Sequence, residues 1–125
     1  MFEKIVEIGI LFDFYGKLLS KKQYLCIEQY YIHDLSLAEI GENINISRQG
    51  VYDNIKRAEE KLYGYEEKLG LIYRFKNNNK NINEILKIVD EIISYNDNDY
   101  IDCVKKAKVI KRLAEGILDN NQEVK

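Results

Sequence analysis

The segment from Ser36 to Arg57 limits the possible folds more than any other part of the chain. Ser36 followed by Glu39 is the capping-box pattern with which α-helices begin, and Ser47 offers a second serine cap for a longer helix. Asn45, which tolerates the left-handed backbone conformation, lies in the short turn between the two helices. Two capped helices joined by such a turn predict a helix-turn-helix unit.

Apolar residues in this segment are spaced so that the two helices pack as one unit. Gly41, which has no side chain, lies where the second helix must approach closely, and Ile46 fills the corner between the helices. The residues expected to hold the two helices together are Ile40, Ile44, Val51 and Ile55. This packing leaves the polar side chains near the start of the second helix facing outward.

Those outward-facing residues point to nucleic-acid binding, because helices of this kind meet base edges in the major groove near their N-termini. Arg48 is the expected reader of guanine and Gln49 the expected reader of adenine. Lys56 and Arg57 suit phosphate contacts, which position a protein without specifying sequence. With Tyr52 on the same face, these five residues form the candidate site.

The same segment has a simpler interpretation as a helical hairpin with a solvated charged face. Asp53 lies on the proposed binding face and repels phosphate, against three basic residues between Ser47 and Arg57. In the whole chain 19 Lys and Arg residues stand against 21 Asp and Glu residues, which gives no overall attraction to polyphosphate. Binding to nucleic acid must therefore come from a local patch.

The rest of the chain also has helical periodicity, and its 125 residues include no proline. Helices are predicted over residues 2–15 and 20–34 and from residue 47 toward Gly70, and Ser20 with Gln23 forms another capping box. Gly64 disfavours helix, so a bend or an earlier end of the third helix there is the alternative. The apolar residues of the first helix extend beyond one face, so we expect it to be buried on more than one side. The tyrosines expected to pack in the core are Tyr24, Tyr30 and Tyr31.

Residues 76–81, with the sequence KNNNKN, contain no apolar side chain and are predicted to be a linker. The linker divides a helix-turn-helix domain over residues 1–75 from a helical hairpin over residues 82–125, with a turn at NDND, residues 96–99. Two helices make a poor core, so the hairpin is expected to pack on the first domain or on another copy of itself. The expected fold is all-α, with a three-to-four-helix N-terminal domain before the hairpin.

No pattern in the sequence indicates catalysis, a cofactor or a metal site. His33 is the only histidine and lacks partners for such a role, and Cys26 and Cys103 lack ligand spacing. Two reduced thiols are typical of a cytoplasmic protein. Charged residues interrupt the apolar N-terminus, so no membrane-spanning segment is expected. The sequence favours a non-enzymatic cytoplasmic protein.

A second basic cluster lies in the stretch KKAKVIKR, which begins at Lys105 and Lys106. This cluster is a candidate surface for phosphate contacts, and it suits RNA, whose helices are recognised by shape and backbone. The alternative is an ordinary solvated helix face, which charge runs usually form.

The strings FDFYG, DLSLAEI and SRQGVYDNIKRAEEKL resemble the YlxM family (UPF0122) of small bacterial helix-turn-helix proteins. The resemblance covers Leu11 to Leu71, and the same region is similar to the promoter-reading region 4 of sigma factors. It implies a wholly helical fold, a homodimer and a regulatory part in the signal recognition particle pathway. The chain departs from the family pattern at Gly50, where alanine is common, and this weakens the start of the second helix by about 1 kcal/mol.

Three functions follow from these observations and stay open at this point. The first is a regulator that binds duplex DNA through the second helix of the motif. The second is an accessory protein of the signal recognition particle, which contacts its RNA or its GTPase without binding duplex DNA. The third is a dimeric interaction module in which the C-terminal hairpin is the active part.

Overall fold

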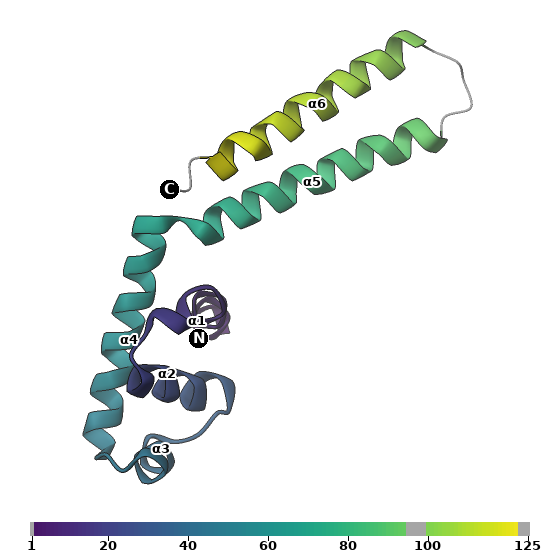
Figure 1. Ribbon diagram of the computed structural model, residues 1–125. Coiled ribbons are helices and arrows are strands. Elements are labelled where there is room, and N and C mark those ends of the chain that lie inside the picture. Colours follow the sequence, from purple (N-terminus) through teal and green to yellow (C-terminus); the bar gives the residue numbers. More distant parts are fainter. Residues whose placement is uncertain (1, 95–99, 123–125) are drawn as a thin grey trace. The chain divides into compact units, whose positions relative to one another are not determined.

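The computed structural model describes residues 2–94 and 100–122, and every regular element in these ranges is helical. The predicted all-α class is therefore confirmed. The chain divides into two compact units, Met1–Ile72 and Tyr73–Lys125. The α-helices, labelled in Figure 1, are α1 (Phe2–Tyr15), α2 (Lys21–Ile27), α3 (Leu37–Ile44), α4 (Arg48–Leu69), α5 (Leu71–Ser94) and α6 (Tyr100–Gln122).

Serine side chains begin three of these helices, as predicted. The Ser20 and Ser36 hydroxyls accept hydrogen bonds from the backbone N–H groups of Gln23 and Glu39, whose side chains complete both capping boxes. Ser47 Oγ accepts from the Gly50 N–H at 2.9 Å. Because each cap satisfies donors that the first helical turn leaves unpaired, the helix starts are fixed by local sequence.

The turn between α3 and α4 has the predicted geometry. Asn45 has a φ of 59°, in the left-handed region, and the Ile46 N–H donates to the Gly41 carbonyl at 3.0 Å. A Cβ on Gly41 would lie 2.7 Å from the Ile46 carbonyl oxygen, which is closer than real Cβ contacts. Glycine is therefore required at this position for the two helices to approach.

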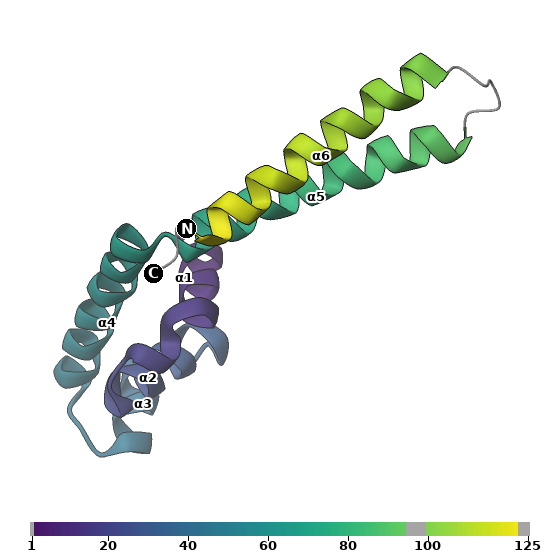
Figure 2. The same cartoon turned by 45° about the horizontal axis from the view of Figure 1, so that its top comes forward.

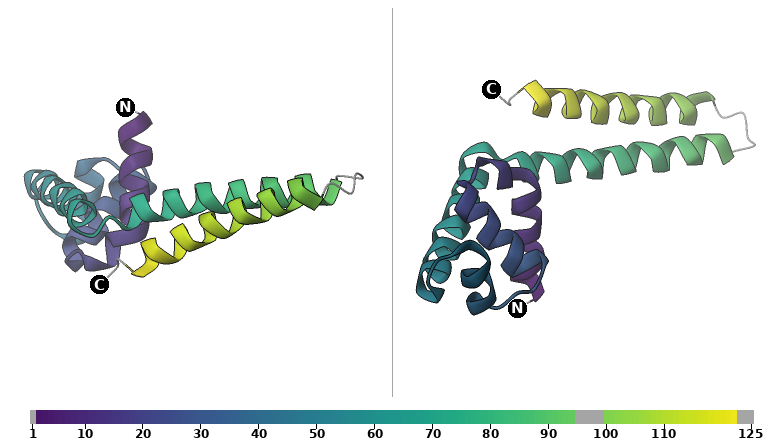
Figure 3. Two further views of the ribbon diagram at one scale, coloured as in Figure 1. Left: turned by 90° about the horizontal axis from the view of Figure 1, so that it is seen from above. Right: turned by 60° about the horizontal axis from the view of Figure 1, so that its bottom comes forward.

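The core of the first unit lies between α4 and the three shorter helices α1, α2 and α3, which pack on one side of α4 (Figures 1 and 3). Each of the helices α1 to α4 contributes fully buried positions: Ile8, Tyr15, Cys26, Ile27, Ile40, Val51, Ala58 and Leu62. The expectation that α1 is buried on more than one side is wrong for Ile5 and Val6, which are 48% and 59% exposed. Within this unit, α4 and the segments next to it cover one side of α1.

α2 continues into a π-helical turn, η2 (Glu28–Ile32), and the structure ends this helix near His33 as predicted. Tyr24 and Tyr31 pack against the core, but Tyr30 is 38% exposed and the expectation for it is wrong. A π-turn shifts the helical register by one residue. Tyr31 rather than Tyr30 therefore faces the core.

A hydrogen-bond network closes the end of α4. Gly70 ends the helix with a φ of 64°. The Tyr15 hydroxyl donates to Glu66 Oε1 at 2.5 Å and accepts from the Leu71 N–H at 3.1 Å. Glu66 Oε1 also accepts from the Ile72 N–H at 3.0 Å. These bonds hold the end of α4 and the start of the next helix against α1.

In the second unit, α5 and α6 run antiparallel and side by side (Figures 1 and 2). Lys106 on α6 forms ion pairs with Asp102 at 3.2 Å and with Glu91 of α5 at 3.6 Å. Ile88 is the only residue of this unit's described part that is buried. The hairpin thus has little core of its own.

Residues 76–81, the predicted linker, lie within α5 as helix. Extending an existing helix across a short polar stretch costs much less than starting a new one, so the surrounding apolar residues carry the helix through. The two-domain division with limits at 75 and 82 stays a prediction. The NDND turn at 96–99 falls outside the described residues. Among the described helices none is long and apolar enough to cross a membrane.

Candidate nucleic-acid interface

The first turns of α4 present the predicted site residues to solvent. Val51 is fully buried and Ile55 is 4% exposed, so this side of α4 is fixed against the core. Arg48 and Gln49 are exposed, and Tyr52 is 45% exposed. The side of α4 opposite the core is therefore free to meet a partner.

A shallow hollow lies on this exposed face. It is lined by Leu37 from α3 and by Arg48, Gln49 and Tyr52 from α4. Sequence reasoning did not include Leu37, although its position one residue after the Ser36 cap already placed it at the start of α3. The hollow combines an apolar floor with hydrogen-bonding groups, a mixture that suits the edge of a base pair with its methyl group.

Gln49 is held by Asp53 one turn further along α4. Its Nε2 donates to Asp53 Oδ1 at 3.1 Å. This bond orients the amide and occupies one of its two donor hydrogens, while the Asp53 carboxylate adds a negative charge to the same face. Base reading by Gln49 must therefore occur beside a group that repels phosphate.

Lys56 is held close to the protein by two contacts. Its Nζ lies 3.8 Å from Glu59 Oε2 and 5.5 Å from the centre of the Tyr52 ring. Glu59 is only 7% exposed, accepts a hydrogen bond from the Tyr31 hydroxyl and pairs with Lys4 at 3.4 Å. Burial, followed by the bond to Glu59, raises the pKa of Tyr31. Sequence reasoning missed this network, because a charged residue in a polar stretch gives no sign that it is buried.

The structure groups four of the predicted residues and separates the others. Arg48, Gln49, Tyr52 and Lys56 share one side of α4, whereas Arg57 follows Arg48 by nine residues. Nine residues are two and a half helical turns, so Arg57, although exposed, points to the other side of the helix.

Lys105 and Lys106 belong to the second unit and differ from each other. Lys106 is engaged in the ion pairs with Asp102 and Glu91, whereas Lys105 is exposed. Lys108 and Arg112 follow Lys105 at helical spacing and are also exposed. The basic face of α6 therefore consists of Lys105, Lys108 and Arg112.

A second polar hollow lies along α5, over the stretch predicted to be a linker. It is lined by Lys76, Asn79, Lys80, Asn83, Glu84 and Lys87. The three-to-four-residue spacing of these side chains was visible in the sequence, but it has meaning only if the stretch is helical. Across the described part of the chain, no group of three or more His, Cys, Asp or Glu side chains is arranged to hold a metal ion.

Comparisons with known proteins agree with the helix-turn-helix arrangement of α3 and α4. The sequence model of the UPF0122 family, YlxM / p13-like helix-turn-helix proteins, matches residues 2–105. A UPF0122 protein of Acetivibrio thermocellus is 44% identical over 115 residues, which cover 92% of this chain and 94% of the relative. One from Desulforamulus reducens is 41% identical over 110 residues, covering 87% and 92% of the two chains. One from Listeria welshimeri is 48% identical over 85 residues, covering 68% and 77%.

Proposed function

This chain belongs to the UPF0122 family of helix-turn-helix proteins, and we propose from that premise that it is a regulatory protein that binds duplex DNA through α4. One observation carries the proposal. Arg48 and Gln49 stand exposed in the first turn of α4 because Val51 and Ile55 fix the other side of the helix in the core. This is the part of a recognition helix that meets base edges.

In this proposal the start of α4 enters the major groove. Arg48 donates to guanine, and Gln49 reads adenine with its orientation set by Asp53. Tyr52 and Leu37 give the apolar surface of the hollow. The N-terminus of α4 favours a nearby phosphate through the N–H groups of its first turn that have no partner within the helix. Lys56 and Arg57, which point to different sides of α4, contact phosphates of the DNA backbone.

The charge of the first unit limits how strongly it binds nonspecific DNA. Acidic residues outnumber Lys and Arg between Met1 and Ile72, so attraction arises only from the α4 patch. Two or three phosphate contacts give a slope of log affinity against log salt on the order of −2 to −3. Sequence-dependent contacts must therefore supply much of the binding.

A second candidate function is that of an accessory protein of the signal recognition particle that contacts its RNA or its GTPase. The basic face of α6, Lys105, Lys108 and Arg112, favours an RNA backbone as its partner. For this second candidate function too, we propose that the protein is cytoplasmic and has a regulatory role.

Both candidate functions include a homodimer. The third candidate function is a dimeric interaction module in which the C-terminal hairpin makes the contacts. Ile82, Leu86 and Ile93 recur along one side of α5 and are 43%, 56% and 75% exposed. A second copy of the hairpin would bury this stripe and give both copies the core that each lacks. Measuring the mass in solution tests the dimer, and a monomer at micromolar concentration would exclude it.

A binding titration separates the nucleic-acid candidates. The protein is titrated with random-sequence duplex DNA and with signal recognition particle RNA at two salt concentrations. We expect Arg48→Ala to abolish the stronger affinity, whereas Lys68→Ala, which removes one exposed charge from the far end of α4, leaves it nearly unchanged. Loss of binding in Lys105→Ala/Lys108→Ala, with Arg48→Ala unaffected, would move the site to α6. These two lysines are preferable to Lys106, whose removal also breaks the ion pairs of the hairpin.

A further inference from the structure

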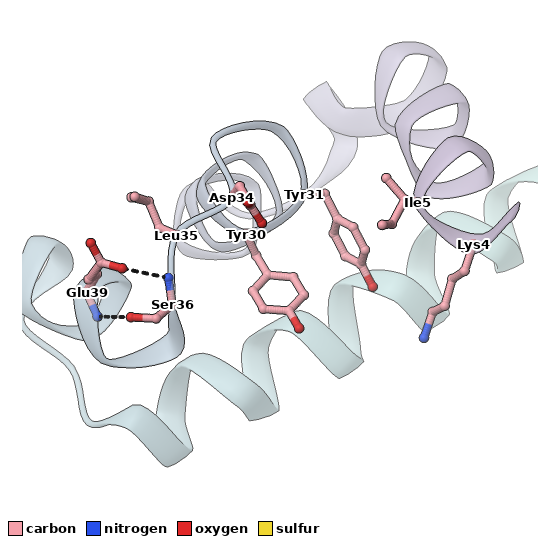
Figure 4. Close-up of a pocket in the computed structure, with 8 residues that line it drawn as sticks. All are labelled: Lys4, Ile5, Tyr30, Tyr31, Asp34, Leu35, Ser36 and Glu39. Atoms are coloured by element: carbon pink, nitrogen blue, oxygen red, sulfur yellow. Dashed lines mark hydrogen bonds between the residues drawn. The ribbon is translucent and has the colours of Figure 1, made fainter. Parts of the chain in front are cut away.

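A cavity of about 650 Å³ lies in the first unit and shares no lining residue with the hollow on α4. Figure 4 shows it between α1, the end of η2 and the start of α3, above the ribbon of α4. Its lining residues are Lys4, Ile5, Tyr30, Tyr31, Asp34, Leu35, Ser36 and Glu39. The nucleic-acid proposal uses none of these residues.

Two aromatic rings form the middle of the cavity. Tyr30 and Tyr31 meet edge to face, with their ring centres 5.0 Å apart. The Tyr31 hydroxyl is held by Glu59, so its ring is fixed, and Tyr30 as a residue is 38% exposed. Ile5 and Leu35 add apolar surface on either side (Figure 4). The cavity therefore offers a prearranged wall on which a flat group can stack.

Charge is distributed unevenly around this wall. Asp34 lies beside Tyr30, Glu39 lies at one end, and Lys4 lies at the other end (Figure 4); both carboxylate residues are exposed. The Lys4 ammonium is already paired with Glu59 at 3.4 Å, so it gives an incoming anion little free positive charge. A cation meets the Asp34 carboxylate, the Glu39 carboxylate, which also accepts a hydrogen bond from the Ser36 N–H, and the exposed Tyr30 side chain, while a phosphate meets repulsion.

We propose that this cavity binds an arginine side chain of a protein partner. The planar guanidinium stacks on an aromatic ring and donates forked hydrogen bonds to carboxylates, whereas a lysine ammonium is a strongly hydrated point charge that fits this wall less well. Ile5, which lines the cavity, is 48% exposed, and Val6 follows it on α1 and is 59% exposed, so both offer apolar surface to the residues next to the arginine. The partner is thus a basic segment with apolar neighbours around its arginine.

The probe is a blocked Leu-Arg-Leu tripeptide, titrated into the full-length isotope-labelled protein and followed by amide chemical shifts. We expect saturable shifts at Tyr30, Asp34 and Glu39. The same peptide with lysine should bind more weakly, and the peptide with citrulline, which is uncharged but has the same shape, should not bind. Equal binding of the citrulline peptide would overturn the proposal.

Two substitutions remove the negative charge without disturbing the backbone. Asp34 has a φ of 55°, which asparagine also tolerates, and glutamine in place of Glu39 keeps the capping box with Ser36. We expect Asp34→Asn/Glu39→Gln to weaken arginine-peptide binding about tenfold or more, since two charge-assisted contacts are lost. Asp13→Asn/Glu42→Gln, which changes two exposed carboxylates outside the cavity lining, is the matched control and should bind normally.

A third variant tests the aromatic wall. Tyr30→Leu keeps an apolar side chain but removes the ring, so we expect weaker binding and loss of the preference for arginine over lysine. Unchanged affinity in both Asp34→Asn/Glu39→Gln and Tyr30→Leu would overturn the proposal. Guanosine monophosphate is the competing probe: if it shifts the same amides and binds more tightly to Asp34→Asn/Glu39→Gln, the cavity is a nucleotide site instead.

Discussion

Gly41 and Ile46 approach so closely that a Cβ on Gly41 would lie 2.7 Å from the Ile46 carbonyl oxygen. That oxygen is part of the backbone and cannot rotate away, so a side chain at this position forces α3 and α4 apart. We expect Gly41→Ala to lower the free energy of unfolding by about 1–3 kcal/mol, measured by urea denaturation.

Gly64→Ala is the matched control, because a Cβ there meets nothing within 4 Å and the position lies inside α4. It should raise stability by up to about 1 kcal/mol through helix propensity alone. If Gly41→Ala were as stable as the unmodified protein, the tight turn described for the motif would be incorrect.

The Tyr15 hydroxyl serves both Glu66 and the Leu71 N–H, and phenylalanine would leave these groups without that partner. We expect Tyr15→Phe to lower the free energy of unfolding by about 1–3 kcal/mol. The more specific readout is hydrogen exchange of the Leu71 amide, which should become much faster. Tyr52→Phe, which alters an exposed hydroxyl, should change neither quantity.

Glu39 gives the start of α3 a dependence on pH. The backbone hydrogen bond from Ser36 is the main cause that lowers the pKa of Glu39 below its ordinary value of 4.5. A lowered pKa in the folded state stabilises the fold above the unfolded pKa, and this contribution is lost as pH falls through the folded pKa. We expect α3 to lose protection from hydrogen exchange below about pH 4.5, and Glu39→Gln to remove that dependence. An unaltered pH profile in Glu39→Gln would contradict this assignment.

Asp53 limits the affinity of the proposed DNA-binding face. Asp53→Asn keeps an oxygen that accepts from Gln49 and removes the negative charge. We expect affinity for duplex DNA at low salt to rise by roughly threefold to tenfold, as loss of one nearby repulsion implies. Asp13→Asn changes the net charge equally at an exposed position on α1 and should have a much smaller effect. Weaker binding by Asp53→Asn would instead make Asp53 a base-reading residue.

Local patterns predicted the helix-turn-helix segment well, because its caps and its turn depend on residues close in sequence. Ser36, Asn45 and Ser47 each act within a few positions of their partners. The exposure of Arg48 and Gln49 also followed from the apolar side of one helix. Such features can be read along the chain without knowing the tertiary fold.

Features that combine distant segments were not predictable in this way. The cavity joins Lys4, Tyr30 and Glu39, and the π-turn that rotates Tyr30 outward has no clear sequence pattern. Glu59 is buried because α1 and η2 bring Lys4 and Tyr31 to it. The polar stretch at 76–81 has no apolar side chain to bury and therefore resembles a linker in sequence, whereas propagation of the helix from its flanks decides its structure.

The most direct test of the proposed function is to map amide chemical shifts of the full chain during titration with a duplex DNA. We expect the largest changes to cluster at residues 48, 49, 52, 53 and 56 and in the Leu37 region, and we expect Arg48→Ala to suppress them. Changes confined to α5 and α6, with the first turns of α4 unaffected by the duplex, would contradict the proposed function.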